Sequence, residues 1–297
     1  PNNLVKIINK VMKNKVKKIE YKPQSIYNDK ITKRYAYPSL TSLPKKTKDK
    51  IYKELIDLNK KYLEKTPKFS SMYDYFNKGY GKTAGKIFSK LFKNLYGVSP
   101  KIIESSIRRN SCMGRLKFLD DKEMMFLKKN YNYLENTLAA RNNTEGNGKI
   151  GTSIYPDNQK GLRGWCDNSK NFLQNKGISI RNGIDIKKIS ENKNQVILKT
   201  NEGDMTFDKV IWCNSNLEQI SKFCKFKFKD YSYGVPLVYF TYILKHKDLI
   251  KNFSYLHNFD SNRIFFRVHN AGFNTGQKDN NGNSFITVEC FSSLNSK

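Results

Sequence analysis

Apolar residues recur every three to four positions along the first half of the chain, which is the spacing of one face of an α-helix. This pattern predicts a basic amphipathic helix over residues 3–19 and a second helix over residues 45–65. Residues 70–140 are expected to be mostly helical, with a break at residues 97–100, because Pro100 cannot continue the preceding helix. The first half therefore predicts a helical layer.

The pattern changes after a polar, glycine-containing linker at residues 142–150. A helix that contains Trp165 is expected to end at Gly177, and short runs rich in β-branched residues follow it. These runs predict strands over residues 178–180, 184–189, 196–200 and 210–213, with a hairpin turn at residues 201–204. Further strands are predicted over residues 236–244, 262–268 and 284–291.

The order of elements in residues 154–215 resembles the second half of the FAD-binding domain in the flavin-containing amine oxidase and protoporphyrinogen-oxidase-like superfamily. The matching residues are Tyr155-Pro156, Gly177-Ile178-Ser179-Ile180, residues 184–189, Gly203 and Asp208-Lys209-Val210-Ile211. Two departures are clear. Residues 157–161 replace the family's glycine pair after Tyr-Pro, and Cys213-Asn214-Ser215 replaces its small-x-Pro.

Residues 69–120 resemble the same superfamily, including its UDP-galactopyranose-mutase-like branch. The matching residues are Tyr73-Asp74-Tyr75-Phe76, Tyr80-Gly81 and Tyr96-Gly97-Val98-Ser99-Pro100. Residues 24–38 resemble the short hairpin that precedes this region in the family.

The resemblance implies a mixed α/β (α+β) fold, in which a discontinuous Rossmann-like FAD-binding domain is interleaved with a substrate domain of mixed sheet and helical cap. Residues 1–38 would form a connecting helix and hairpin, and residues 39–149 the helical cap. Residues 150–222 would be the second part of the FAD-binding domain, and residues 223–297 the substrate-domain sheet.

The chain contains no strand–GxGxxG–helix motif, which would place a pyrophosphate against backbone N–H groups. The nearest stretch, residues 79–85, differs in spacing by one residue and follows a helical pattern, so a turn between helices is the better interpretation. We therefore expect a fragment that lacks its first βαβ unit and a final flavin-contacting segment, and that holds FAD weakly alone.

The formal net charge of +29 comes mostly from lysines that are spread along the chain. Because nucleic-acid surfaces favour arginine, we expect no nucleic-acid partner, although a non-enzymatic basic nucleic-acid-binding protein remains the second alternative function. Helix 3–19 could contact a membrane surface peripherally, but packing against another domain is favoured. The longest apolar run, residues 235–244, is too short to span a bilayer and suits a core strand.

The five cysteines are far apart and form no CxxC motif, which predicts reduced thiols, a cytoplasmic protein and no metal site. Cys213, at the end of a predicted apolar strand, is expected to be buried rather than catalytic. No Ser/His/Asp set or carboxylate pair is evident, which argues against a hydrolase and leaves the catalytic residues unassigned.

The resemblance also implies cofactor contacts. The backbone of Ile186 would meet the adenine of FAD, and Asn214 and Ser215 would approach the flavin. On the predicted strand 262–268, Arg263 and Arg267 are four residues apart and share a face, so they could hold an anionic small-molecule substrate. Tyr239 is a further substrate candidate. A solvated strand face and ordinary core packing remain the alternatives for these side chains.

The function that the resemblance implies is an FAD-dependent oxidoreductase, in which the isoalloxazine itself takes the hydride or electron pair. The alternative is a UDP-galactopyranose-mutase-like isomerase, in which Arg263 and Arg267 would hold a pyrophosphate.

Overall fold

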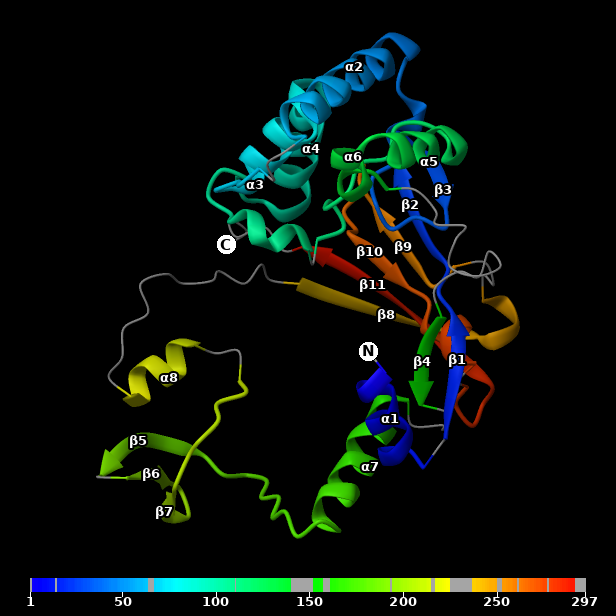
Figure 1. Cartoon of the computed structure of the whole chain (residues 1–297). Coiled ribbons are helices and arrows are strands. Elements are labelled where there is room, and N and C mark those ends of the chain that lie inside the picture. The colour runs from blue at the N-terminus through cyan, green and yellow to red at the C-terminus, as the bar shows by residue number, and fades with distance from the viewer. Residues whose placement is uncertain are drawn as a thin grey trace. The chain divides into compact units, whose positions relative to one another are not determined.

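A computed structural model describes residues 2–13, 15–63, 67–109, 111–139, 152–156, 161–192, 194–214, 217–224, 237–249, 253–260, 262–276 and 278–291. The chain forms two compact units (Figure 1). Unit 1 comprises Pro1–Gly164 and Val235–Lys297, and unit 2 comprises Trp165–Gly234. Unit 2 is thus inserted into unit 1, as an interleaved fold requires.

A six-stranded mixed sheet with the order β3-β2-β9-β10-β11-β8 is the framework of unit 1. Its strands are β2 (Pro23–Tyr27), β3 (Lys30–Lys33), β8 (Leu237–Lys245), β9 (Tyr255–Asn258), β10 (Arg267–His269) and β11 (Asn283–Phe291). Only β2 and β9 pair in parallel within it. Asn28 and Asp29, with φ of 50° and 56°, form the tight turn of the β2–β3 hairpin that the sequence predicts.

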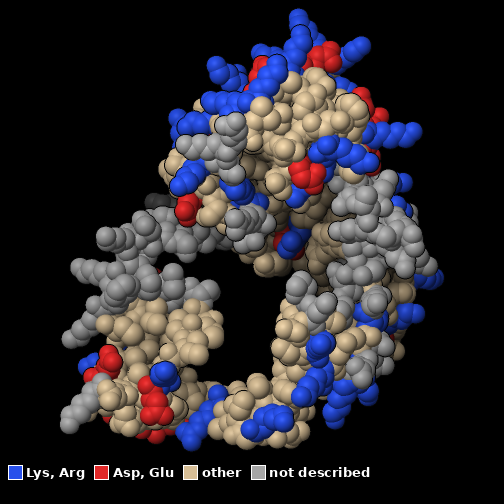
Figure 2. Space-filling view, in the orientation of Figure 1, with Lys and Arg blue, Asp and Glu red and all other residues tan. Residues whose placement is uncertain are grey.

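Helices at one end of this sheet form a layer with the main apolar core of unit 1 (Figure 1). They are α2 (Lys45–Lys61), α3 (Met72–Asp74), the π-helical turn η2 (Tyr75–Gly79), α4 (Gly81–Tyr96), α5 (Asp121–Asn130) and α6 (Asn132–Thr137), with 3-10 turns η1 (Leu40–Ser42) and η3 (Ser105–Arg109). Phe76, Tyr80 and Phe88 are completely buried between them. Many Lys and Arg side chains project from the outer surface of this layer (Figure 2).

The predicted helix over residues 45–65 is confirmed as α2, and the predicted break is confirmed where α4 ends at Tyr96. Gly97, with φ of 68°, closes α4 in the left-handed conformation that glycine adopts without strain.

The first predicted helix is wrong beyond Val11. Helix α1 (Asn2–Val11) is followed by Lys13 in a left-handed conformation and then by strand β1 (Val16–Glu20). Strand β1 pairs with β4 (Thr152–Pro156), so pairing with a distant strand overrides the helical pattern in this segment. The remaining short elements of unit 1 are η4 (His246–Asp248) and α9 (Ala271–Thr275).

The prediction that residues 235–244 form a core strand is wrong as to burial, as β8 shows. This strand lies at the edge of the sheet instead of in the core, and Tyr239, Tyr242 and Ile243 are exposed. The predicted strand 262–268 is also shorter than expected, because β10 begins only at Arg267.

Unit 2 contains most of α7 (Leu162–Gln174), the antiparallel strands β5 (Ile186–Asn192), β6 (Gln195–Thr200) and β7 (Gly203–Phe207), and α8 (Leu217–Cys224). The predicted turn at residues 201–204 is confirmed by the pairing of Thr200 with Gly203. The strand that follows the turn is β7, at Gly203–Phe207, instead of the predicted strand 210–213. Among the described residues of this unit no strands pair in parallel, so the Rossmann detail stays a prediction, as do the domain boundaries.

Two predicted strands of unit 2 are wrong. The segment 178–180 instead follows the end of α7, where the amide of Ile178 bonds to the carbonyl of Leu173, 3.1 Å away. The segment 210–213 has no strand partner in the described part of the chain, and Ile211 is 87 % exposed. Cys213 is likewise exposed, which contradicts its predicted burial. Across the described residues, no helix is both long and apolar enough to cross a bilayer.

Candidate active site

A row of polar side chains crosses the six-stranded sheet. The register places Tyr239 opposite Glu289, Glu289 opposite Arg267, Arg267 opposite His257 and His257 opposite Ser25. Directly opposed residues point to the same face of a sheet. The structure therefore brings Arg267 and Tyr239, both predicted from the sequence, onto one face.

Arg267 is held in place by an ion pair and by two rings. Its Nε and Nη2 donate to the Glu289 carboxylate over 2.9 and 2.8 Å, and its guanidinium lies over the rings of Tyr255 and Phe266, 5.3 and 5.7 Å from their centroids. Glu289 is buried, whereas the Arg267 side chain is 34 % exposed. Such a bidentate pair fixes the plane of the guanidinium. In the described part of the chain Nη1 has no partner, so it remains free for a ligand.

Arg263 has a different setting. It precedes β10, so the expectation that Arg263 and Arg267 share one strand is wrong. Its Nη2 and Nη1 pair with Asp29 and Asp260 over 2.6 and 3.1 Å. Asp260 also accepts bonds from the amides of Asn28 and Asp29. Arg263 therefore ties the β2–β3 turn to the loop before β10, and its role toward a substrate stays a prediction.

The groups around Arg267 are kept neutral. Burial, together with the charge of Arg267, lowers the pKa of His257 to about 4 and also lowers the pKa of His269. Burial raises the pKa of the Cys112 thiol to about 11. The Arg267–Glu289 pair is thus surrounded by uncharged rings and a thiol near neutral pH.

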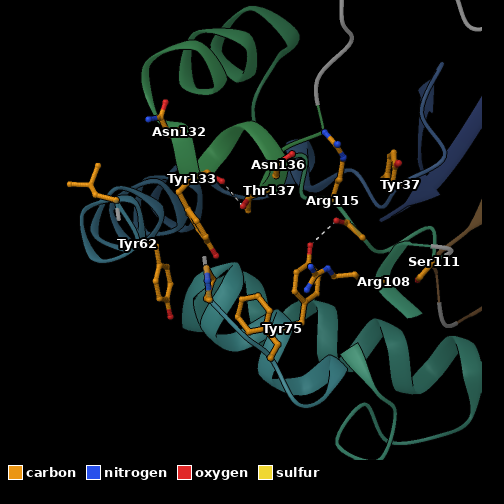
Figure 3. A pocket seen from close by; sticks show the side chains of 14 residues that line it. Tyr37, Tyr62, Tyr75, Arg108, Ser111, Arg115, Asn132, Tyr133, Asn136 and Thr137 are labelled. Carbon is orange, nitrogen blue, oxygen red and sulfur yellow. Dashed lines mark hydrogen bonds between the residues drawn. The ribbon is translucent and has the colours of Figure 1, made fainter. Parts of the chain in front are cut away.

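A cavity of about 750 Å³ opens in the helical layer of unit 1 (Figure 3). Arg108 and Arg115 line one side of it with Tyr37 and Ser111, and Tyr62 lies on the opposite side (Figure 3). The remaining described lining residues are Leu63, Pro67, Phe69, Tyr75, Gly114, Asn132, Tyr133, Asn136 and Thr137. None of the described lining residues is acidic, which makes the cavity electropositive.

Each arginine of the cavity is oriented by its neighbours. The guanidinium of Arg108 lies 5.0 Å from the ring centroid of Tyr75 and 5.8 Å from that of Phe69. Arg115 donates from Nη1 to the carbonyl of Leu138 over 3.3 Å. In the described part of the chain neither arginine has a carboxylate partner within ion-pair distance. Both are therefore available to an anion.

The segment 108–115 connects the cavity with the sheet. Arg108, Ser111 and Arg115 line the cavity, while Cys112 lies 3.9 Å from the hydroxyl of Tyr96 and interacts electrostatically with Arg267. Arg108 and Arg115 are not among the residues that the sequence predicts for the site. The available signal was that few arginines occur in this lysine-rich chain and that several fall within eight residues.

The candidate cofactor residues lie in unit 2. Ile186 is the half-buried first residue of β5, and a bulge follows it, where Lys187 has no direct partner on β6. Asn214 is exposed just before α8, and Ser215 lies outside the described residues. The bulge interrupts the β5–β6 pairing next to Ile186, and the adenine contact expected of Ile186 stays a prediction.

The sequence contains no strand–GxGxxG–helix motif that would hold the pyrophosphate of FAD. Residues 79–85 are a turn between helices only at Tyr80, because η2 ends at Gly79 and α4 begins at Gly81. Gly85, inside α4, serves close packing, because a Cβ there would lie 2.5 Å from the carbonyl oxygen of Phe76. The structure thus gives residues 79–85 no role toward the pyrophosphate of FAD, and the adenine contact of Ile186 stays a prediction.

No protein-family model matches the sequence, and no curated protein matches it. Solved structures do share its fold. Reduced UDP-galactopyranose mutase aligns at a TM-score of 0.61 and 13% identity, covering 96% of this chain and 60% of that one. An oxidoreductase from Methanosarcina mazei aligns at 0.52 and 11%, covering 94% and 61%. A putative protoporphyrinogen oxidase from an Exiguobacterium species aligns at 0.52 and 10%, covering 97% and 62%.

These likenesses show that the chain shares its fold with UDP-galactopyranose mutase, an oxidoreductase and a putative protoporphyrinogen oxidase, the fold that the resemblance stated in the sequence analysis predicts. The chain spans about 60% of the length of the mutase. At such low identities the likeness establishes the fold alone.

Proposed function

We propose that the chain is part of an FAD-dependent oxidoreductase that acts on a small anionic substrate. The observation that carries the proposal is the match of nearly the whole chain, 96%, to the fold of UDP-galactopyranose mutase, together with similar matches to two structures titled as an oxidoreductase and a putative protoporphyrinogen oxidase. When bound, FAD would supply the hydride or electron transfer. Residues of this chain would bind and orient the substrate.

The cavity in the helical layer supports an anionic substrate. Arg108 and Arg115 can donate to phosphate or carboxylate oxygens, and Tyr37, Tyr62 and Tyr75 offer flat apolar walls. Arg267, whose Nη1 is free in the described part of the chain, would contact the same substrate where it leaves the cavity toward the sheet. Tyr239 lies two strands away in the same row.

A UDP-galactopyranose-mutase-like isomerase is the second candidate. The specific observation that favours it is the combination of paired arginines and tyrosine rings in one cavity, since a nucleoside diphosphate presents both a base to stack and a pyrophosphate to bind. Under this reading Arg108 and Arg115 would hold the pyrophosphate, because two carboxylates already neutralise Arg263.

The substrate proposals are tested by titrating the purified chain with pyrophosphate, UDP and UDP-galactose while tyrosine and tryptophan fluorescence is recorded. Replacing one arginine by glutamine, in R108Q or R115Q, should weaken UDP binding about tenfold or more, as expected for the loss of a charge-assisted hydrogen bond. The matched control is R181Q, which removes an exposed arginine of unit 2 and should leave binding unchanged. Failure of UDP-galactose to bind would exclude the isomerase. Failure of every anion to bind would exclude the anionic substrate.

The cofactor proposal is tested by equilibrium dialysis of the chain against FAD and riboflavin. FAD should bind weakly, because the chain offers no pyrophosphate loop, yet more tightly than riboflavin, because only FAD carries adenine. I186P removes the backbone N–H at the adenine position and should abolish that preference. Equal binding of the two flavins would contradict the proposed contact, and a purified chain with stoichiometric yellow flavin would contradict the expected weakness.

A further inference from the structure

Two polar atoms are buried side by side in the six-stranded sheet without a described partner. They are Ser25 Oγ and His257 Nδ1. Ser25 is 1 % exposed and His257 6 %. The register of the parallel β2–β9 pair places them directly opposite each other. Both side chains therefore point to the same face, on strands about 4.8 Å apart.

If nothing binds between them, these two unpaired atoms lower the stability of the folded chain. A buried polar atom without a partner costs about 1–3 kcal/mol, and apolar residues of similar size would remove that cost. The register places the two side chains on neighbouring strands, within the span of one bridging molecule. One molecule placed between them would satisfy both at once.

The surroundings define the chemistry of that molecule. His257 packs against the rings of Phe259 and Phe266, at centroid distances of 6.4 and 5.9 Å, and neighbours Arg267. Because burial and the charge of Arg267 keep the imidazole neutral, it offers one donor and one acceptor, and a serine hydroxyl offers the same. A cation would be repelled by Arg267, and an anion would find no charged partner in this pair. A neutral hydroxyl group fits both.

We propose that Ser25 and His257 form a binding site for a single hydroxyl group, and that this group is a buried water molecule. The near-complete burial of both residues favours water over the hydroxyl of a substrate. The water would fix the ring of His257, which borders Phe266, the ring beneath the guanidinium of Arg267. This inference does not depend on the proposed function.

A crystal structure of the chain at about 1.5 Å resolution, without added ligand, tests the proposal directly. The expected result is one ordered water within hydrogen-bond distance of both Ser25 Oγ and His257 Nδ1. Electron density that appears there only after soaking with glycerol would show that the site binds a hydroxyl group. It would overturn the proposal that this group belongs to a water molecule. A direct bond between the two side chains, or a bond from either to another residue, would overturn the site.

Urea unfolding of variants provides an independent test. S25A should lower the folded-to-unfolded ratio about tenfold, the usual effect of leaving a buried partner with fewer hydrogen bonds. The double variant S25A/H257L should lose less than the sum of the single variants, because no orphan atom then remains. T32A is the matched control, since Thr32 lies opposite Ser25 on the other neighbouring strand. A stability of S25A equal to that of the unmodified chain would overturn the proposal, and this holds even if variants at His257 fail to fold.

Discussion

At the scale of single residues, Glu289 fixes the orientation in which Arg267 can meet a ligand. The buried carboxylate of Glu289 accepts hydrogen bonds from Nε and Nη2 of the guanidinium, and Nη1 has no partner among the described residues. An arginine without this partner would sample many rotamers, whereas the ion pair fixes one orientation before any substrate binds. Glu289 is therefore a positioning residue under the proposed function.

E289Q should destabilise the fold, because it leaves the guanidinium of Arg267 without its counter-charge. The expected loss in the free energy of unfolding is about 1–3 kcal/mol, at the lower end to the extent that solvent reaches Arg267. Urea unfolding measures it. E218Q is the control, because the Glu218–Lys222 pair is mostly exposed and its loss should leave the free energy of unfolding essentially unchanged. Equal losses in the two variants would contradict a structural role for Glu289.

His257 should make stability depend on pH. Its pKa is about 4 in the folded chain against 6.5 when unperturbed, so between these values the unfolded chain binds a proton that the folded chain does not. Stability should therefore be full above about pH 6.5 and fall as the pH drops toward 4, by up to roughly 3 kcal/mol. The difference between the unfolding curves of the native chain and H257F isolates this contribution. A difference that is constant over this pH range would contradict it.

At the scale of elements, the sequence predicts those helix ends and turns that are determined by neighbouring residues. The presence of α2 and the glycine-terminated ends of α4 and α7 follow from periodicity and capping, although α2 ends at Lys61, before the predicted residue 65. The β2–β3 hairpin follows from the resemblance, and the turn between β6 and β7 from turn chemistry. The failures have distant causes. Residues 16–20 form a strand only because β4, more than 130 residues away, pairs with them. Arg108 and Arg115 form a site only because a turn of the helical layer returns them to one cavity, which no sequence spacing shows.

The crossing of α4 with the π-helical turn η2 should be the most sensitive contact of the helical layer. A Cβ at Gly85 would lie 2.5 Å from the Phe76 carbonyl oxygen and 2.6 Å from Asn77 Cα, and backbone atoms cannot yield locally. G85A should therefore cost about 2–3 kcal/mol or more. G97A, at the end of the same helix, meets no atom within 4 Å and carries only the left-handed strain, about 1 kcal/mol. Thermal unfolding ranks the two, and the reverse order would refute the packing role of Gly85.

At the scale of the whole molecule, the two units differ in how they bury apolar surface. Every buried hydrophobic side chain among the described residues belongs to unit 1, including the aromatic cluster around Phe76 and Tyr80. The described strands of unit 2 keep their large side chains half-buried or exposed. Stability should therefore be unevenly distributed between the units, since apolar burial is the main favourable term in folding.

Hydrogen exchange followed by mass spectrometry should show this difference directly. Amides of β5, β6 and β7 should exchange at least about tenfold faster than those of β9, β10 and β11, because opening the three-stranded sheet of unit 2 exposes little buried apolar surface. Saturating FAD should slow exchange at residues 186–188 before any other segment of unit 2, if the bulge after Ile186 meets the adenine. Riboflavin, which lacks adenine, is the matched ligand control and should leave this segment unchanged. Equal protection of the two sheets without ligand would show that unit 2 is stabilised by contacts other than its own core. Slower exchange with both flavins would place the flavin ring, not the adenine, against β5.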